Sequence, residues 1–342
     1  MIAYTCLLLV PCLFSAMRIG NRNSGRYLFF IGVFYVIFIG LRQSVGVDWH
    51  AYELIYEEIS VLPLGLALLR QDPGFALLNW LLIQFDTGVY GVNVVVAIIF
   101  VSGLIRIAKM TPIPWLALVA VTPYLVIAVA MSGVRQAAAI GLFFHLIASW
   151  RSGKIKKLFI AATAVTFHSS AIVSLFLVLQ SLQLSKWMKR FVLVTIGLLI
   201  LYIFSQSAQF GVYQQRYFVN KIDSPGALQH VLLNAIPGVI YLFFIQKWKN
   251  LYGKNPLMVI FSLLSILSVF LVPLSSTVVD RLALFLTPIQ MLVYGSLPVV
   301  FKKPVYAFYI VCVHFFILYV WLLFSNSSWA FIPYDNVLFH LL

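Results

Sequence analysis

The chain has 342 residues, of which 63% are hydrophobic and only 9% are charged, and its mean hydropathy is +1.01. Because a soluble domain carries about 25% charged residues, this composition excludes an ordinary soluble enzyme and predicts an all-α polytopic integral membrane protein. The net charge of +14 is spread over 23 basic residues between the apolar runs, so membrane topology explains it better than binding to nucleic acid does.

Chemistry that depends on metals or nucleotides has little support in the sequence. Cys6, Cys12 and Cys312 form no C-x-x-C pair, and neither a Walker A motif nor a D-x-D pair occurs. No two histidines stand four residues apart. We therefore expect no metal and no cofactor.

Apolar runs of helical length follow one another along the chain. At about 20 residues per crossing they fill it as one membrane domain, 1–342. Basic residues follow the first run and do not precede it, which predicts a retained helix rather than a signal peptide. The runs lie at 2–17, 27–41, 90–105, 113–131, 135–150, 158–184, 191–205, 229–246, 257–275, 282–300 and 304–324.

The positive-inside rule places the basic clusters between these runs in the cytoplasm. Residues 158–184 have basic groups at both ends, so we predict a broken or re-entrant helix pair that turns near 167–170. The stretch 75–85 is too short to span, and we expect it to lie on the outer face as an interfacial helix. These choices give about twelve transmembrane segments, both termini outside, and outer loops at 42–89 and 206–229.

In this topology all 9 acidic residues fall outside, whereas few of the basic residues do. Arg42, Arg135 and Arg281 are among those few, and each abuts the outer end of a different apolar segment. One such arginine is explained by snorkelling to lipid headgroups. Three at one membrane level predict an outward-facing site for a lipid-linked phosphate or diphosphate, because guanidinium binds phosphate oxygens in a bidentate way.

Polar residues accompany the first two arginines. Asp48 and Tyr52 follow Arg42 in a glycine-containing segment, and Asp48 is either a functional carboxylate or only the N-cap of the next helix. Gln136 follows Arg135 after a tight turn, where the free N–H groups of the next helix favour an anion.

Other polar groups are candidates with alternatives of their own. His168 stands at the predicted break, where an intramembrane ionisable group is a functional hypothesis. Asp280 precedes Arg281, and the two either neutralise each other or act on substrate. Arg216 and Tyr217 in the loop 206–229 suit binding to sugar rings, although an aromatic belt looks similar.

With these motifs the chain resembles the EpsG family of bacterial polysaccharide polymerases, which is close to the Wzy-type O-antigen polymerases. The matching elements extend over most of the chain. They are G-L-R-x-x-x-G-x-D-x-x-x-Y at 40–52, S-G-x-R-Q at 132–136, F-H-x-S-A at 167–171, Arg281 opening a late helix, and Pro-Tyr at 333–334.

The resemblance implies a fold related to the C-type membrane glycosyltransferases and O-antigen ligases. It implies that a growing glycan leaves undecaprenyl diphosphate and joins the nonreducing end of a lipid-linked repeat unit, at the periplasmic face of the bacterial inner membrane. A chain-length regulator of the Wzz type is a possible partner.

The candidate residues fit that chemistry. Arg42, Arg135 and Arg281 are expected to bind the diphosphate, and His168, Asp48 and Asp280 are candidates for the base that deprotonates the acceptor hydroxyl. Further substrate contacts are expected from Gln136, Tyr52, Arg216, Tyr217 and Tyr334. His168 is favoured as the base, because an imidazole accepts a proton near neutral pH.

Two other functions remain open from the sequence. A flippase for the same lipid-linked sugars is the main alternative, although its charges should extend from the inner face. A membrane acyltransferase also places a histidine in apolar surroundings, but the outward arginines have no obvious task there.

Overall fold

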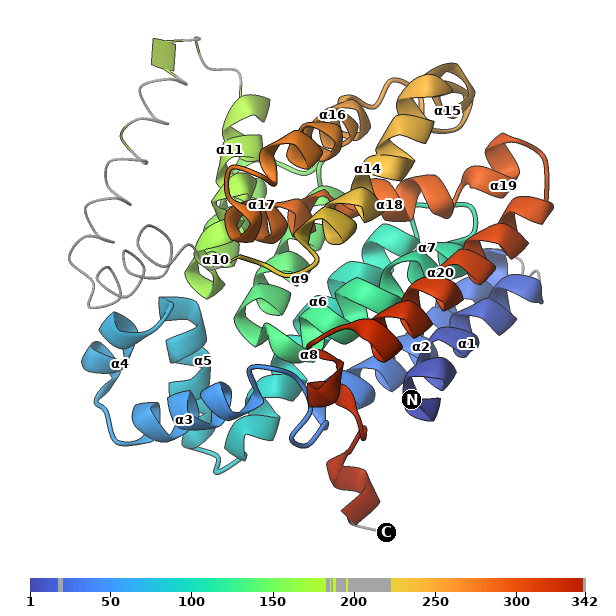
Figure 1. Ribbon diagram of the computed structural model, residues 1–342. Coiled ribbons are helices and arrows are strands. Elements are labelled where there is room, and N and C mark those ends of the chain that lie inside the picture. Colours follow the sequence, from blue (N-terminus) through green and yellow to red (C-terminus); the bar gives the residue numbers. More distant parts are fainter. Residues whose placement is uncertain (18–20, 183–184, 186, 189–194, 196–222, 341–342) are drawn as a thin grey trace.

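The computed structural model describes residues 1–17, 21–182, 185, 187–188, 195 and 223–340, and every regular element among them is helical (Figure 1). The first half holds α1 (Ile2–Ala16), α2 (Asn21–Gly40), α3 (Trp49–Ser60), α4 (Leu64–Arg70), α5 (Pro73–Ile83), α6 (Gly88–Ala108), α7 (Pro114–Val121), η1 (Thr122–Val129), α8 (Ala130–Ser132), α9 (Val134–Ala148), α10 (Lys154–Phe167), η2 (Ser169–Ala171) and α11 (Ile172–Ser181). The second half holds α14 (Ala227–Phe243), α15 (Ile245–Tyr252), α16 (Pro256–Leu271), α17 (Ser276–Ala283), η4 (Leu284–Leu286), α18 (Thr287–Tyr294), α19 (Leu297–Val300), α20 (Val305–Phe324), η5 (Ser328–Phe331) and η6 (Val337–His340).

The centre of the molecule is built around α6 and α9, which pack along each other. The backbones come close at Gly141 of α9, where an added Cβ atom would lie 2.5 Å from the Phe100 Cα of α6. Small side chains let helix backbones approach closely, which is how helices associate where no water drives them together. This pairing fixes the start of α9, which carries Arg135.

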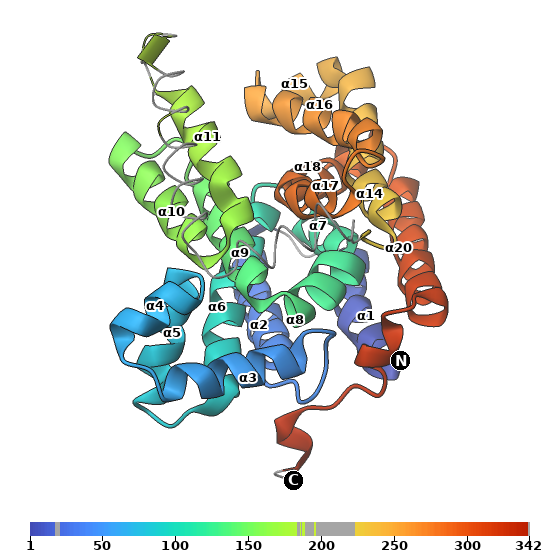
Figure 2. The same cartoon turned by 60° about the vertical axis from the view of Figure 1, so that its left-hand side comes forward.

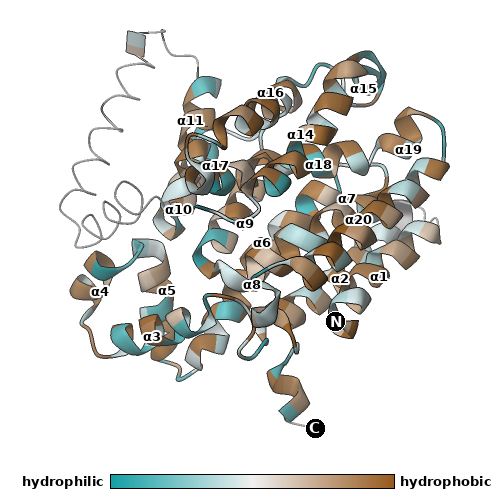
Figure 3. Cartoon of the chain, in the orientation of Figure 1, coloured by the Kyte–Doolittle hydropathy of each residue, from teal (hydrophilic) through white to brown (hydrophobic). Residues whose placement is uncertain are grey.

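Hydrophobic residues make up much of the helical body, as the brown ribbons of Figure 3 show, and many of them are exposed. Phe316 and Phe324 on α20 and Phe270 on α16 are each at least 70% exposed. A water-soluble protein rarely exposes so many large apolar side chains. The protein is therefore embedded in a membrane.

Four of the described helical segments are long and apolar enough to cross a membrane, or five if one bent pair counts as a span. The four are Gly88–Ala108, Pro114–Ser132, Ser276–Tyr294 and Val305–Phe324. Shorter apolar helices such as α1, α9 and α16 accompany them. The expectation of about twelve segments with both termini outside stays a prediction, and the run 191–205 lies almost wholly outside the described residues.

The predicted break near residues 167–170 is present. α10 ends at Phe167, His168 has an extended backbone, and the chain continues through η2 into α11. Figures 1 and 2 both place α10 and α11 side by side. A second bend, of 88° between α14 and α15, was not predicted, since the sequence there reads as one apolar run followed by lysines.

The segment 42–89 holds three helices, α3, α4 and α5, grouped at one end of the molecule (Figure 2), and α5 covers most of the stretch 75–85 for which an interfacial helix was predicted. One boundary differs from the sequence interpretation. The late helix expected to open at Arg281 begins earlier as α17, so Arg281 lies in its last turn. This first helical turn was not predicted, because residues 275–277 are polar and the helix boundaries were predicted from apolar runs.

Candidate functional site

Arg135, at the start of α9, is held by contacts with α3 and with the start of α5. Its Nη1 atom lies 3.0 Å from Asp72 Oδ2 and 3.4 Å from Gln71 Oε1, and both partners lie at the start of α5. Its backbone N–H donates to the hydroxyl of Tyr52 on α3, at 3.4 Å. The Arg135 side chain is 26% exposed, so it is positioned by protein and still in contact with solvent.

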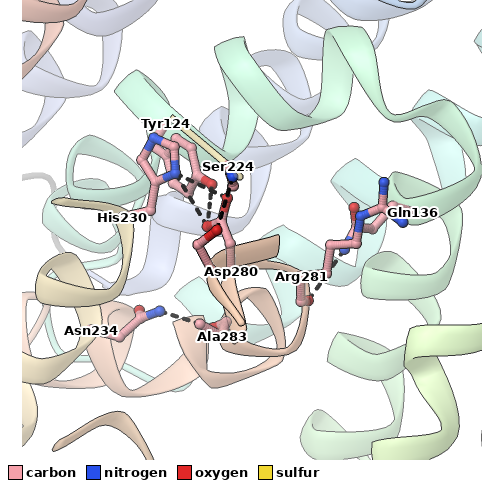
Figure 4. Close-up of polar contacts among 9 residues, drawn as sticks. Tyr124, Gln136, Ser224, His230, Asn234, Asp280, Arg281 and Ala283 are labelled. Carbon is pink, nitrogen blue, oxygen red and sulfur yellow. Dashed lines mark hydrogen bonds and ion pairs between the residues drawn. The ribbon is translucent and has the colours of Figure 1, made fainter. Parts of the chain in front are cut away.

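Gln136 connects this region to Arg281. Its Nε2 atom donates to the backbone carbonyl of Arg281 at 3.2 Å, as Figure 4 shows. Helix α9 thereby comes into contact with the end of α17, and two of the three predicted phosphate ligands come from adjoining elements. Gln136 acts on the backbone in this structure; its predicted contact with substrate stays a prediction.

Asp48 lies in the electrostatic field of both arginines. It takes the N-cap position of α3, but its side chain makes no capping hydrogen bond, so the capping role considered from the sequence is not what holds it. Its carboxylate is accessible to solvent, yet enough protein surrounds it that desolvation raises its pKa, while Arg135 and Arg281 oppose this rise. A negative group beside two arginines limits the net positive charge of the site.

His168 also interacts electrostatically with Arg135 and Arg281. Its Nδ1 atom accepts the backbone N–H of Ser170 at 3.2 Å and lies 2.7 Å from the Ser170 hydroxyl. Since Nδ1 accepts, the proton of the neutral ring sits on Nε2. His168 therefore offers an N–H donor, which suits contact with a phosphate oxygen better than removal of a proton.

Arg42 has a different environment. Its side chain is 1% exposed, and its Nε atom donates to the carbonyls of Val45 and Met131 at 3.0 and 2.9 Å, while Nη1 donates to that of Ile39. The guanidinium lies 5.3 Å from the ring of Trp49. Burial lowers the pKa of Arg42 to about 10, so it stays charged at neutral pH. These contacts favour a role in holding the 41–48 loop; binding of diphosphate by Arg42 stays a prediction.

Asp280 belongs to a second polar cluster that the sequence did not indicate (Figure 4). Its carboxylate accepts hydrogen bonds from Tyr124 at 3.2 Å and Ser224 at 2.6 Å, and His230 Nδ1 lies 3.1 and 3.2 Å from its two oxygens. The His230 ring stacks on Tyr124 with centroids 4.0 Å apart. Asp280 itself is 9% exposed. Asp280 thus belongs to a cluster with Tyr124, Ser224 and His230, next to the end of α17 that Gln136 contacts.

A cavity of about 650 Å³ adjoins this cluster. Its polar side includes Tyr124, Gln229 and His230, and its other wall is the apolar face of α20. Val47, the residue before Asp48, also lines it. The complete lining is Val47, Pro123, Tyr124, Pro225, Gly226, Gln229, His230, Leu233, Phe316, Ile317, Val320, Trp321, Phe324, Ser325, Asn326, Ser327 and Trp329.

The sequence model of the EpsG family matches residues 25–336, nearly the whole chain. The chain belongs to the EpsG family. This family includes Wzy-like polymerases, so the match supports a membrane protein of polysaccharide biosynthesis with a glycosyltransferase-like activity. Neither a curated protein nor a solved structure matches the chain.

The remaining candidates of this EpsG-family chain lie elsewhere. Tyr334 donates its hydroxyl to the carbonyl of Phe38 at 3.0 Å and stacks on the Phe38 ring, so it packs the C-terminal segment against α2. Arg216 and Tyr217 lie outside the described residues. Among the residues that the structure describes, no group of three or more His, Cys, Asp or Glu is arranged to hold a metal ion.

Sequence reasoning missed Asp72, Tyr124, Ser224 and His230. Only one of them had a local signal. Tyr124 follows Pro123, which lacks a backbone N–H, and the helix widens there into the π-helical stretch η1. Such stretches occur frequently at functional sites.

Proposed function

We propose that this EpsG-family protein is a polysaccharide polymerase. It transfers a growing glycan from undecaprenyl diphosphate to the nonreducing end of a lipid-linked repeat unit, at the periplasmic face of the bacterial inner membrane. The single observation that carries the proposal is that Arg135 and Arg281, on elements far apart in sequence, both act electrostatically on Asp48 and on His168, and that Gln136, the residue after Arg135, binds the Arg281 carbonyl.

The two arginines and the N–H donor of His168 suit a diphosphate that becomes more negative as it leaves. Guanidinium groups held by protein contacts stabilise developing charge without reorganising during the reaction. A guanidinium carries five N–H groups, so one arginine can bind a protein carboxylate and a phosphate oxygen at the same time. The diphosphate is already a good leaving group, so we expect neither a metal nor a nucleotide to be required.

The finer features belong to the same proposal. They are about twelve membrane segments, a fold related to the C-type membrane glycosyltransferases, contacts of Tyr52, Gln136, Arg216, Tyr217 and Tyr334 with substrate, and a Wzz-type regulator as partner. Tyr52 supports the site through its hydroxyl, which accepts the Arg135 backbone N–H.

The test uses the purified full-length protein in lipid nanodiscs with synthetic undecaprenyl-diphosphate-linked repeat units, without added metal or nucleotide. We expect a ladder of longer glycans and release of undecaprenyl diphosphate. Arg135→Ala and Arg281→Ala should lose this activity. Arg106→Ala is the matched control, because Arg106 lies in the last turn of α6 and contacts Ser149, away from the residues of the proposed site.

A deletion strain separates polymerase from flippase. Surface glycan made of single capped repeats is expected of a missing polymerase, whereas complete loss of repeats would favour the flippase. Unchanged chain length in the strain, together with no ladder in vitro, would contradict the proposal.

A further inference from the structure

The cavity beside Asp280 has features of an acceptor site. The group formed by Arg135, Arg281 and His168 beside Asp48, called the diphosphate cluster below, lacks them. Aromatic rings, including Trp321 and Trp329, line it together with polar groups such as Gln229, Asn326 and Ser327. Cavities that bind small ligands combine apolar walls with a few placed polar groups in this way. The stacking faces of the rings and the amides of Gln229 and Asn326 suit a sugar ring with its hydroxyls.

His230 presents its ring to this cavity in a defined tautomer. A carboxylate accepts hydrogen bonds and does not donate them, so the Asp280 carboxylate fixes the proton of the neutral ring on Nδ1. Two hydroxyls, from Tyr124 and Ser224, hold the carboxylate in place. Nε2 is then left unprotonated, as a base must be. This is the opposite of His168, whose Nδ1 accepts a backbone N–H.

The space around Nε2 is kept open by Gly226, which also lines the cavity. No described residue forms a hydrogen bond with Nε2. A Cβ atom at position 226 would lie 3.3 Å from Nε2, and the backbone φ of +86° there favours glycine. The ring nitrogen that can accept a proton therefore lies beside a position of the cavity lining that carries no side chain.

The cavity adjoins the diphosphate cluster through two pairs of consecutive residues. Asp280, which orients His230, precedes Arg281, and Val47 of the lining precedes Asp48. An acceptor in the cavity thus lies beside a donor held by Arg135 and Arg281. Glycosyl transfer requires the acceptor and the donor to lie next to each other, because the attacking oxygen must approach the anomeric carbon that the diphosphate leaves.

We propose that the cavity binds the terminal sugar of the acceptor repeat unit and that His230 is the general base. This inference rests on the proposed function. The acceptor hydroxyl gives its proton to His230 Nε2 while its oxygen forms the new bond to the anomeric carbon of the growing glycan. The bond from that carbon to the diphosphate oxygen breaks, and its electron pair stays on undecaprenyl diphosphate. Asp280 is a positioning residue that keeps Nδ1 protonated.

The test measures turnover of lipid-linked repeats and binding of undecaprenyl diphosphate separately, on full-length variants in nanodiscs. His230→Ala should lower turnover by about 10²- to 10⁴-fold and leave the Kd for undecaprenyl diphosphate within about threefold. Added imidazole should restore part of the turnover of His230→Ala. His145→Ala is the matched control, because His145 bonds Ser102 and does not line the cavity.

Asp280→Asn tests the tautomer argument without deleting volume. An amide can donate to Nδ1 and leave the proton on Nε2, as happens when the aspartate of a catalytic triad is replaced by asparagine. We expect turnover to fall nearly as far as in His230→Ala, with diphosphate binding retained and no rescue by imidazole.

Each outcome decides between the two proposals. If the wild-type protein polymerises and His230→Ala does so within about threefold, His230 is not the base and the polymerase function stands. If His230→Ala loses diphosphate binding together with turnover, the base assignment is overturned in favour of a structural role. If the wild-type protein makes no polymer, the proposed function fails and this inference fails with it.

Discussion

At the scale of single residues, three arginines that look alike in the sequence have different surroundings in the fold. Arg42 is enclosed and bonded to three backbone carbonyls, whereas Arg135 and Arg281 are half-buried and lie beside Asp48. Position at the outer end of an apolar run predicts the membrane level of an arginine. It does not predict whether the guanidinium turns toward the backbone or toward a ligand, because that depends on residues distant in sequence such as Met131 and Asp72.

This difference predicts separable effects of Arg→Lys substitutions. Arg42→Lys should lower the free energy of unfolding by about 3 kcal/mol, because an ammonium on a flexible stem cannot reach all three carbonyls. Arg135→Lys should leave stability nearly unchanged and weaken binding of undecaprenyl diphosphate at least about tenfold, equal to about 1.4 kcal/mol. Thermal unfolding and binding in nanodiscs measure the two effects. Equal loss of binding with unchanged stability in both variants would place Arg42 among the phosphate ligands.

Asp48 makes a prediction about pH. Its pKa is raised in the folded protein, so the folded state holds the proton more tightly than the unfolded chain, and the charged carboxylate destabilises the fold above that raised pKa. Asp48→Asn should therefore raise the melting temperature at neutral pH. The gain should disappear below about pH 4, where the carboxyl is neutral in both states. Glu57→Gln, an exposed position on the same helix, serves as the control, and a gain that persists at acid pH would contradict the electrostatic cause.

At the scale of elements, the sequence predicted helix boundaries that depend on neighbouring residues. It did not predict polar clusters that form between helices distant in sequence. The break at His168 and the start of α9 before Arg135 follow from flanking charges and a glycine. The His230–Asp280 pair could not be predicted, because no motif in the sequences of α14 and α17 indicates that these two helices are in contact. The early start of α17 could not be predicted from apolar runs, because Ser276, its first residue, is polar and bonds Ser224 and Asp223.

The loop that leads from α2 to α3 depends on Gly46. Its φ is +108°, and an added Cβ would clash with the carbonyl of Met131, the same carbonyl that accepts a hydrogen bond from Arg42. Gly46→Ala should therefore lower the melting temperature and abolish polymerisation, because the loop that carries Asp48 is displaced. Gly65→Ala is the control, since nothing lies within 4 Å of its added Cβ. Normal activity of Gly46→Ala would show that this loop does not form the site.

At the scale of the whole molecule, the C-terminal segment returns to the loop after α2 and closes one end of the helical body. Gly46 N–H donates to the Ala330 carbonyl at 2.8 Å, and Gln43 N–H donates to that of Asp335 at 3.1 Å. Val47 N–H donates to Ser132 Oγ at 3.0 Å. Residues from three distant parts of the sequence, 43–47, 132 and 330–335, thus meet at this end, together with both polar clusters. The apolar composition predicted a membrane protein, but the meeting of these segments needed the fold.

The opposite end carries the lysines and predicts the orientation of the chain. Helices α7 to α8 run as one span from Pro114 to Ser132. The N-terminal end of this span is tied to Gly295 by the Ile113 N–H, near the basic residues that precede α20. By the positive-inside rule we expect this end to be cytoplasmic and the end with the polar clusters to be periplasmic.

Cysteine labelling tests this orientation in a variant that lacks Cys6, Cys12 and Cys312. Ser44→Cys and Ser327→Cys should react with a membrane-impermeant thiol reagent in intact spheroplasts, because both lie at the end that holds the polar clusters. Ser152→Cys and Lys303→Cys should react only after the membrane is opened, because both positions lie within basic clusters that the positive-inside rule assigns to the cytoplasmic side. A reversed pattern would put Arg135 and Arg281 in the cytoplasm, where a periplasmic lipid-linked repeat cannot reach them, and the proposed polymerase could not work from this site.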